Sequence, residues 1–135
     1  MSYEKPLPLI DLWNGPFWEG CKAGKLMAQK CDQSGEIWLP PSPISPVTRT
    51  DAWSWVELSG QGRVWSWVVM HQRYFKSFSE DLPYNIAQVE LEEGPMLISN
   101  IVGVANEDIQ AGMPVQAVFE DVTDEFTLPR FTPVL

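Results

Sequence analysis

The strongest constraint on the fold is a series of short strand-like segments that begins at Trp53. Within residues 86–93, apolar and polar side chains alternate, so Ala87, Val89 and Leu91 would share one face of a strand. Further segments are bounded by turn residues and lie at 53–58, 63–71, 96–104, 114–122 and 126–135. The 12 prolines and 9 glycines of the chain favour such short strands over long helices.

About five strands in roughly 80 residues, with turns at close intervals, predict a small closed or nearly closed barrel. We expect Gly60 and Gly62 to form a hairpin turn, and residues 105–113 to form one helical turn that ends in glycine. Pro129 and Pro133 place the last segment at a sheet edge, because proline cannot donate a ladder hydrogen bond. The five-stranded OB-fold is the natural candidate, and a small β-sandwich fits the pattern almost as well.

Residues 1–50 have a different pattern and are predicted to form an N-terminal part, ahead of a barrel domain of residues 51–135. Prolines, turn residues and apolar spacing all contribute to this interpretation. The expected elements are an extended arm (1–13), a helix that begins at Asn14 or Gly15 and stops at Gly24, a hairpin of 26–31 and 36–39, and a proline-rich connector (40–46).

Cys31, Ser34, Ser45 and Thr48 have the spacing of a zinc site. Each pair is separated by two residues and ten residues lie between the pairs. Four cysteines at these positions would hold one tetrahedral zinc ion. Because a hydroxyl ionises too weakly to replace a thiolate, we expect no metal here and interpret Cys31 as a small buried apolar residue. A metal held by Cys31 and other neighbours is the alternative.

The net charge of −9 lies entirely in the second part of the chain. Residues 1–50 hold five basic and five acidic side chains, whereas residues 51–135 hold four basic and thirteen acidic ones. Such a surface repels a phosphodiester backbone, so we expect no nucleic-acid partner. No apolar run reaches the roughly 20 residues that span a bilayer, and the N-terminus has no signal-peptide pattern. With only two cysteines, we expect reduced thiols and a cytoplasmic location.

The sequence offers few candidates for catalysis. His71 is the only histidine, and a nucleophilic pair with Cys21 or Cys31 would need the barrel to meet the N-terminal part at that point. Glu90 and Glu92 fall on the outward face of a strand, where a solvated role is the ordinary one. We therefore expect a protein that is not an enzyme, and a hydrolase or thioesterase that depends on His71 is the least favoured hypothesis.

Six segments in a fixed order carry a resemblance to a known family: FWEGCKAGKLMAQKC, WLPPSP, WVELSGQGRVWSWVVMH, LPYNIAQVELEEGPMLISNIVG, GMPVQAVFEDV and TLPRFTP. They resemble the bacterial and archaeal proteins catalogued as domain of unknown function 35. The resemblance covers residues 14–133. It implies a mainly β fold, in which an N-terminal helix and a rubredoxin-like ribbon precede a five-stranded OB-fold barrel.

The resemblance also bears on the metal. The family's four zinc ligands correspond to positions 31, 34, 45 and 48, of which only Cys31 is a cysteine. This departure implies a degenerate ribbon that binds no zinc. In small zinc peptides the metal can contribute more than about 10 kcal/mol. Packing by Trp38, Trp53 and Trp55, the stiff proline run and contact with a partner are the expected replacements.

The function implied by the resemblance is that of a non-catalytic accessory subunit. Family members assemble with thiolase-fold enzymes, including lipid-transfer-protein-like aldolases of steroid side-chain breakdown, or with hot-dog-fold hydratases of the MaoC type. We therefore expect a hetero-oligomer in acyl-CoA metabolism, in which this chain stabilises the enzyme and helps to form the acyl-CoA channel. The chain would bind no cofactor alone and could share acyl-CoA with its partner. A stand-alone acyl-CoA binding protein is the alternative.

Two groups of residues are predicted to carry contacts. The loop of residues 71–84 interleaves cations and aromatic rings, which suit a partner or the phosphates of coenzyme A; its members are His71, Arg73, Tyr74, Phe75, Lys76 and Phe78. These rings could instead cover one end of the barrel. The seven tryptophans exceed what a small core needs, so Trp13, Trp18 and Trp38 are the predicted partner interface.

Overall fold

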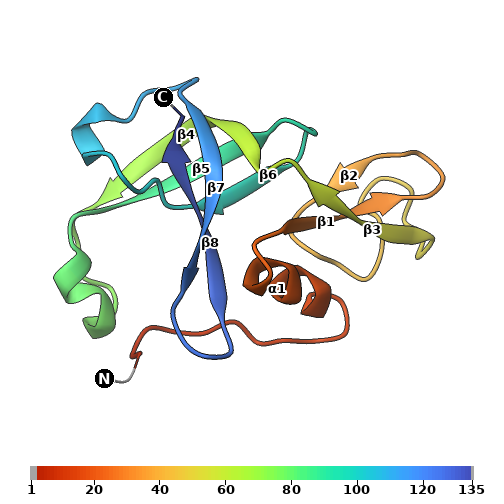
Figure 1. The fold of residues 1–135 in the computed structure, drawn as a ribbon, viewed down its shortest axis with the longest axis horizontal. Coiled ribbons are helices and arrows are strands. Elements are labelled where there is room, and N and C mark those ends of the chain that lie inside the picture. Colours follow the sequence, from red (N-terminus) through yellow and green to blue (C-terminus); the bar gives the residue numbers. More distant parts are fainter. Residues whose placement is uncertain (1–2, 135) are drawn as a thin grey trace.

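The computed structural model describes residues 3–134, which form two β-sheets and one α-helix (Figure 1). Helix α1 covers Gly15–Lys22, and two short 3-10 helices, η1 and η2, cover Lys76–Asp81 and Asn106–Asp108. The strands are β1 (Leu26–Cys31), β2 (Ile37–Trp38), β3 (Trp53–Leu58), β4 (Gln61–Met70), β5 (Tyr84–Leu91), β6 (Met96–Ser99), β7 (Pro114–Asp121) and β8 (Thr127–Pro133). The predicted mainly β fold with an N-terminal helix is confirmed.

Helix α1 begins and ends as the sequence predicts. Pro16 lies in its first turn, where the missing amide hydrogen is not needed by the helix. Gly24 follows the helix with a φ of 77°, a left-handed conformation that glycine adopts without strain. Asn14 precedes the first turn, and its side chain binds the chain before the helix: Nδ2 donates to the carbonyl of Leu9 at 2.9 Å.

The smaller sheet has the strand order β2-β1-β3 and corrects one prediction. All six residues of β3 pair with β1, ending with Trp53 opposite Cys31. β3 therefore extends the sheet of the N-terminal hairpin, and the predicted hairpin turn at Gly60 and Gly62 is wrong. β2 is only two residues long, so most of the pairing of β1 is with β3 on its other side. β3 thereby satisfies backbone groups of β1 that would otherwise form an open edge. Gly60, with a φ of 80°, turns the chain into the larger sheet.

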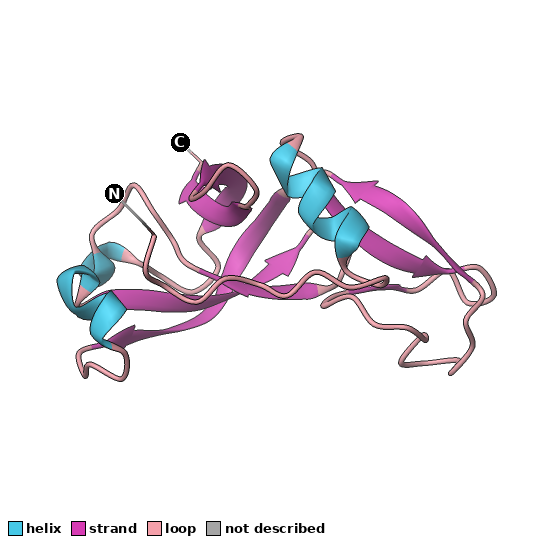
Figure 2. Cartoon of the chain, turned by 90° about the horizontal axis from the view of Figure 1, so that it is seen from below, coloured by secondary structure: helices cyan, strands magenta, loops and turns pink. Residues whose placement is uncertain are grey.

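The larger sheet has the order β6-β5-β4-β7-β8 and curls into a half-barrel (Figures 1 and 2). A bulge in β4 between Val64 and Ser66 increases its twist, as bulges do. The fifth strand is β8, which lies at the sheet edge as its prolines predicted. The two edges of the half-barrel are connected by hydrogen bonds between β8 and the segment that follows β6. The Phe131 amide donates to the Asn100 carbonyl at 3.0 Å, and the Val102 amide donates to the Phe131 carbonyl at 2.8 Å.

One hydrophobic cluster links the helix, the small sheet and the half-barrel. Phe17 and Cys21 from α1 pack in it together with Leu26 of β1 and Phe131 of β8. Cys21 and Phe131 have no exposed surface. The helix thus fills the angle between the two sheets, as Figure 1 shows, and this shared core holds the small sheet at a defined place beside the half-barrel.

Candidate functional site

The structure connects the four degenerate ligand positions through hydrogen bonds. Cys31 Sγ lies 3.2 Å from Thr48 Oγ1, and Ser34 also bonds the Cys31 thiol. Ser45 is fully buried, and its hydroxyl accepts from the amides of Val47 and Thr48 at 3.2 Å each. The spacing seen in the sequence therefore corresponds to a real cluster, in which Thr48 and Ser34 bond the one remaining sulfur and Ser45 bonds the backbone of the same loop.

These hydroxyl groups change the acidity of the thiol. Hydrogen bonds from Ser34 and Thr48 favour the thiolate and lower the pKa of Cys31 to about 6. Burial acts in the opposite direction on the other cysteine and raises the pKa of Cys21 to about 12. Cys31 is thus stabilised in the form that a metal would require, by polar partners from this chain.

Tryptophan packing supports the same part of the chain, as predicted. Edge-to-face contacts run from Trp38 to Trp53 and on to Trp55, with ring centroids 6.3 and 5.8 Å apart. The indole of Trp38 donates to Ser42 Oγ at 2.9 Å, and the indole of Trp53 donates to the Pro43 carbonyl at 3.0 Å. The rings thereby hold the proline-rich connector against the small sheet. Residues 3–134 contain no group of three or more His, Cys, Asp or Glu side chains placed to hold a metal ion.

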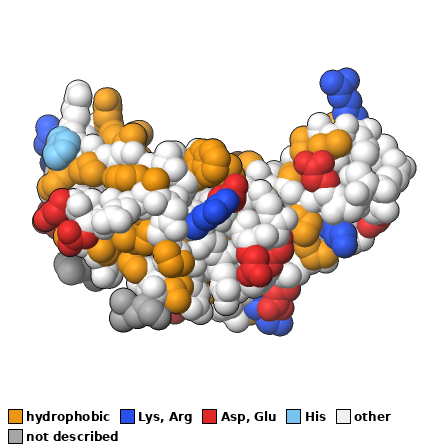
Figure 3. Space-filling model, turned by 90° about the horizontal axis from the view of Figure 1, so that it is seen from above, with side chains coloured by type: hydrophobic (Ala, Val, Ile, Leu, Met, Phe, Trp, Pro, Cys, Tyr) orange, Lys and Arg blue, Asp and Glu red, His pale blue; other side chains and the backbone are white. Residues whose placement is uncertain are grey.

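The predicted contact loop follows β4 and lies at one end of the molecule. His71, Arg73 and Lys76 are exposed there, and Figure 3 shows hydrophobic side chains gathered beside the histidine at that end. Tyr74 and Phe75 are 65% and 59% exposed, so they do not cover the barrel. Phe78 is different, because its half-buried ring packs between Phe75 and Tyr84, with centroids 6.1 and 5.6 Å away. The loop therefore has an outer tip and an anchored base.

The three tryptophans of the predicted interface fall in different environments. Trp13 is 41% exposed. Trp18 is half-buried and packs edge-on against Phe17 and Phe126. Trp38 is only 6% exposed, because it belongs to the tryptophan cluster of the ribbon. Only Trp13 presents a largely free ring, and the structure does not gather the three rings into one surface patch.

The groups considered for catalysis are occupied elsewhere. His71 is exposed in its loop, whereas both cysteine side chains are fully buried, so no thiol meets the imidazole. Glu90 forms an ion pair with Arg63 at 2.6 Å. Glu92 accepts from the Ser59 hydroxyl at 3.2 Å. These carboxylates thus stabilise strand and turn geometry.

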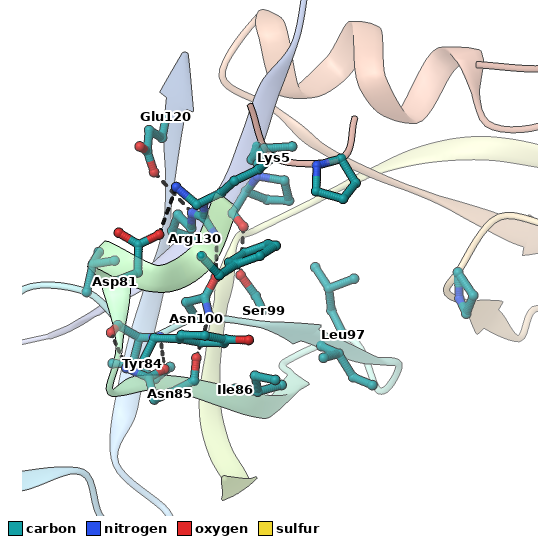
Figure 4. Close-up of a pocket in the computed structure, with 18 of the residues that line it drawn as sticks. Lys5, Asp81, Tyr84, Asn85, Ile86, Leu97, Ser99, Asn100, Glu120 and Arg130 are labelled. Carbon is teal, nitrogen blue, oxygen red and sulfur yellow. Dashed lines mark hydrogen bonds and ion pairs between the residues drawn. The ribbon is translucent and has the colours of Figure 1, made fainter. Parts of the chain in front are cut away.

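A cavity that the sequence interpretation missed lies along the edge strands β6 and β8 of the half-barrel (Figure 4). Its volume is about 890 Å³, and the N-terminal arm, α1, η1, β5, β6, β7 and β8 line it. Polar groups gather on one side. Lys5 binds Asp81 at 2.7 Å, and Arg130 binds Glu120 at 3.1 Å and also Asn100. The indole nitrogen of Trp18, which also lines the cavity, is buried and has no hydrogen-bond partner among the described residues.

Asn85 is the residue from which the sequence could have predicted this cavity. It occupies the strand face that Ala87 and Val89 share, where the alternation calls for an apolar residue. Its buried side-chain amide donates to the Ile101 carbonyl at 2.8 Å and accepts from the Ile101 amide at 2.7 Å. This pairing holds the segment after β6, whose residues Asn100 and Val102 bond Phe131 of β8, in the wall of the cavity.

Comparison with known proteins supports the fold. A family model described as the C-terminal OB-fold domain of ChsH2 matches residues 55–120. A solved structure described as the Ltp2-ChsH2(DUF35) aldolase covers 96% of this chain and 100% of its own, at 36% identity and a TM-score of 0.85. None of the described helices is both long and apolar enough to cross a membrane.

Two similar proteins are named as hydratase alpha subunits. The probable enoyl-CoA hydratase alpha subunit of Thermomonospora curvata is 36% identical over 131 residues, which are 97% of this chain and 40% of that protein. The 3-oxo-4,17-pregnadiene-20-carboxyl-CoA hydratase alpha subunit of Mycobacterium tuberculosis is 35% identical over 80% of this chain and 34% of its own length. The chain thus spans well under half of these relatives.

A third relative has a comparable length. The DUF35 domain-containing scaffold protein of Methanocaldococcus jannaschii is 35% identical over 101 residues, which are 74% of this chain and 71% of that protein. The match includes most of both chains. The chain therefore belongs to the DUF35 family of OB-fold proteins.

Proposed function

We propose that the chain is a non-catalytic accessory subunit of an enzyme complex in acyl-CoA metabolism. The observation that carries the proposal is the full-length similarity to the ChsH2(DUF35) chain, which belongs to a structure described as an aldolase that also contains Ltp2. The names of the other relatives, scaffold protein and hydratase alpha subunit, support the same role. The catalytic partner would be a thiolase-fold enzyme, such as a lipid-transfer-protein-like aldolase, or a hot-dog-fold hydratase.

The loop of residues 71–78 is the docking surface that we favour. Arg73 and Lys76 form no ion pair within residues 3–134, whereas the barrel's other two cations, Arg63 and Arg130, are paired with glutamates. The two free cations flank two exposed aromatic rings in a chain whose net charge is −9. A partner surface with carboxylates around an apolar depression would complement this tip.

Affinity purification of the tagged chain from its native host at moderate salt, followed by mass spectrometry, tests the function. A stoichiometric thiolase-fold or hot-dog-fold enzyme is the expected result, and it would also identify the reaction and the acyl substrate, including a steroid side chain as in the M. tuberculosis relative's name. A chain that elutes alone and monomeric would overturn the proposal.

A double variant, Tyr74→Ala/Phe75→Ala, tests the docking surface in the same purification. Both rings are exposed, so the variant should fold and lose the enzyme. Val47→Ala, which truncates an exposed apolar side chain of the ribbon, is the control and should retain it. If both variants retain the enzyme, the loop is not the docking surface, although the subunit role would stand.

The alternative function, a stand-alone acyl-CoA binding protein, makes a different prediction. It requires measurable affinity of the isolated chain for coenzyme A, which calorimetric titration would detect. We expect no such binding, because the acidic surface repels a polyanion. For the same preparation, elemental analysis should find no stoichiometric zinc. The cytoplasmic location stays a prediction, which cell fractionation would test.

A further inference from the structure

The N-terminal arm of residues 3–8 is attached to the rest of the molecule by very little. Within residues 3–134 the arm's backbone makes no hydrogen bond, and its single polar contact is the ion pair between Lys5 Nζ and Asp81 Oδ2 at 2.7 Å. Pro6 and Pro8 cannot donate a backbone hydrogen bond at all. The arm is therefore an extended segment held mainly at one side chain.

Lys5 nevertheless sits in a well-defined place. Its ammonium group lies 5.6 Å from the ring centroids of both Tyr3 and Phe78, within the range of cation–π attraction. The hydrogen bond to Asp81 raises the pKa of Lys5, so the ammonium stays charged. Figure 4 shows Lys5 reaching from the arm toward Asp81 above the cavity.

The arm forms part of the wall of the 890 Å³ cavity. Tyr3, Lys5 and Pro6 line it together with residues of β5 and β6. Immediately after the arm, the chain is fixed by a compact turn. Asp11 Oδ1 accepts from the amides of Trp13 and Asn14, and Asn14 Oδ1 accepts from the Asp11 amide, all at 2.8 Å. A fixed turn next to a weakly attached segment has the arrangement of a hinge and a strap.

We propose that residues 3–8 are a displaceable strap, which the contacts of Lys5 with Asp81 and Phe78 hold across the mouth of the cavity. Release of Lys5 swings the strap about the turn at residues 9–14 and widens the opening of the cavity. Asp81 and Phe78 both belong to η1, which continues from the exposed loop tip. The Phe78 ring lies next to both Phe75 and Lys5. A molecule bound to Phe75 at the loop tip would therefore be only one ring away from Lys5.

Nuclear magnetic resonance on the isolated 15.3 kDa chain tests the strap without any partner. Order parameters of the Glu4, residue 5 and Leu7 amides should be near the rigid value of about 0.85 in the wild type and below about 0.6 in Lys5→Gln and Asp81→Asn. The exchange of the Trp18 indole hydrogen with water, which reports cavity opening, should become about fivefold faster, as expected from loss of a partly exposed ion pair.

Two further variants test whether these effects are specific to the ion pair between Lys5 and Asp81. Lys25→Gln removes a cation whose ion pair with Glu57, at 3.8 Å, lies on the small sheet, and it should leave the arm and the Trp18 hydrogen unchanged. The exchanged pair Lys5→Asp/Asp81→Lys should restore order to the arm. An arm that is equally ordered in the wild type and Lys5→Gln, or already flexible in the wild type, would overturn the proposal. Because no partner takes part, this outcome is independent of the accessory-subunit function.

Discussion

The side-chain amide of Gln29 pairs with the backbone of Ser42 at both of its ends. Nε2 donates to the Ser42 carbonyl and Oε1 accepts from the Ser42 amide, each at 2.8 Å. Gln29 has no exposed surface. The side chain therefore makes the two hydrogen bonds that the backbone of a neighbouring strand would make. It links β1 to the proline-rich connector, which has few backbone donors of its own. With the tryptophan cluster, this contact fastens the loop that bears Ser45 and Thr48.

Loss of this contact should weaken the ribbon. Gln29→Met keeps the length of the side chain but leaves the Ser42 amide and carbonyl without partners, at a cost of about 2 kcal/mol in unfolding free energy. Urea denaturation followed by tryptophan fluorescence measures the change. Gln33→Met, in the exposed turn after β1, is the matched control and should change stability by less than about 0.5 kcal/mol. Equal effects of the two substitutions would contradict the role of Gln29.

The Cys31 thiolate should make stability depend on pH. The pKa of Cys31 is about 6 in the folded chain, below the value of about 8.5 for an unfolded cysteine. The folded state therefore binds this proton less tightly than the unfolded state does. The stabilisation by the Cys31 thiolate is fully present above about pH 8.5 and is lost as pH falls through 6. Unfolding midpoints of the wild type and Cys31→Ser, compared between these limits, should diverge as pH rises.

Cys21 offers the internal control for this experiment. Its pKa of about 12 keeps it protonated in the folded chain, and an unfolded cysteine ionises only near pH 8.5. Cys21→Ala should therefore lower stability by the same amount at each pH below about 8. If the stability difference between wild type and Cys31→Ser is constant from pH 6 to 8.5, the hydroxyl groups do not hold a thiolate.

Phe75 and Phe131 should differ sharply in their effect on stability. Phe131 is fully buried and Phe75 is 59% exposed. Phe131→Ala should cost about 3–5 kcal/mol through lost burial and a residual cavity, whereas Phe75→Ala should cost less than about 1 kcal/mol. Thermal or urea unfolding gives both values. A large loss for Phe75→Ala would mean that the loop tip packs within the chain and is not free for a partner.

Gly62 should tolerate no side chain, for a reason of space. A methyl group at this position would lie 2.6 Å from the Glu90 carbonyl oxygen in the neighbouring strand. Gly62→Ala should therefore destabilise the half-barrel by about 1–3 kcal/mol. At Gly15 the nearest atom would be 3.9 Å away, so Gly15→Ala should be neutral or slightly stabilising because alanine favours a helix. Calorimetric midpoints of the two variants test this difference.

The local patterns of the sequence determined most of the elements. Alternation located β5 and β7, Pro16 and Gly24 bounded α1, and prolines placed β8 at an edge. These signals are local, because side-chain period and backbone freedom depend on a few neighbouring residues. The spacing of Cys31 and Thr48 likewise identified two positions that lie 3.2 Å apart in the structure.

Only the tertiary structure decided which elements meet. β3 was predicted as a barrel strand, yet it pairs with β1, since the side-chain pattern of a strand does not specify its neighbour. Trp38 and Trp13 look alike in sequence, but one is 6% and the other 41% exposed. The cavity beneath Lys5 depends on groups from many separate segments. Contacts between residues more than 70 positions apart, such as Lys5 and Asp81, leave no periodic trace in the chain.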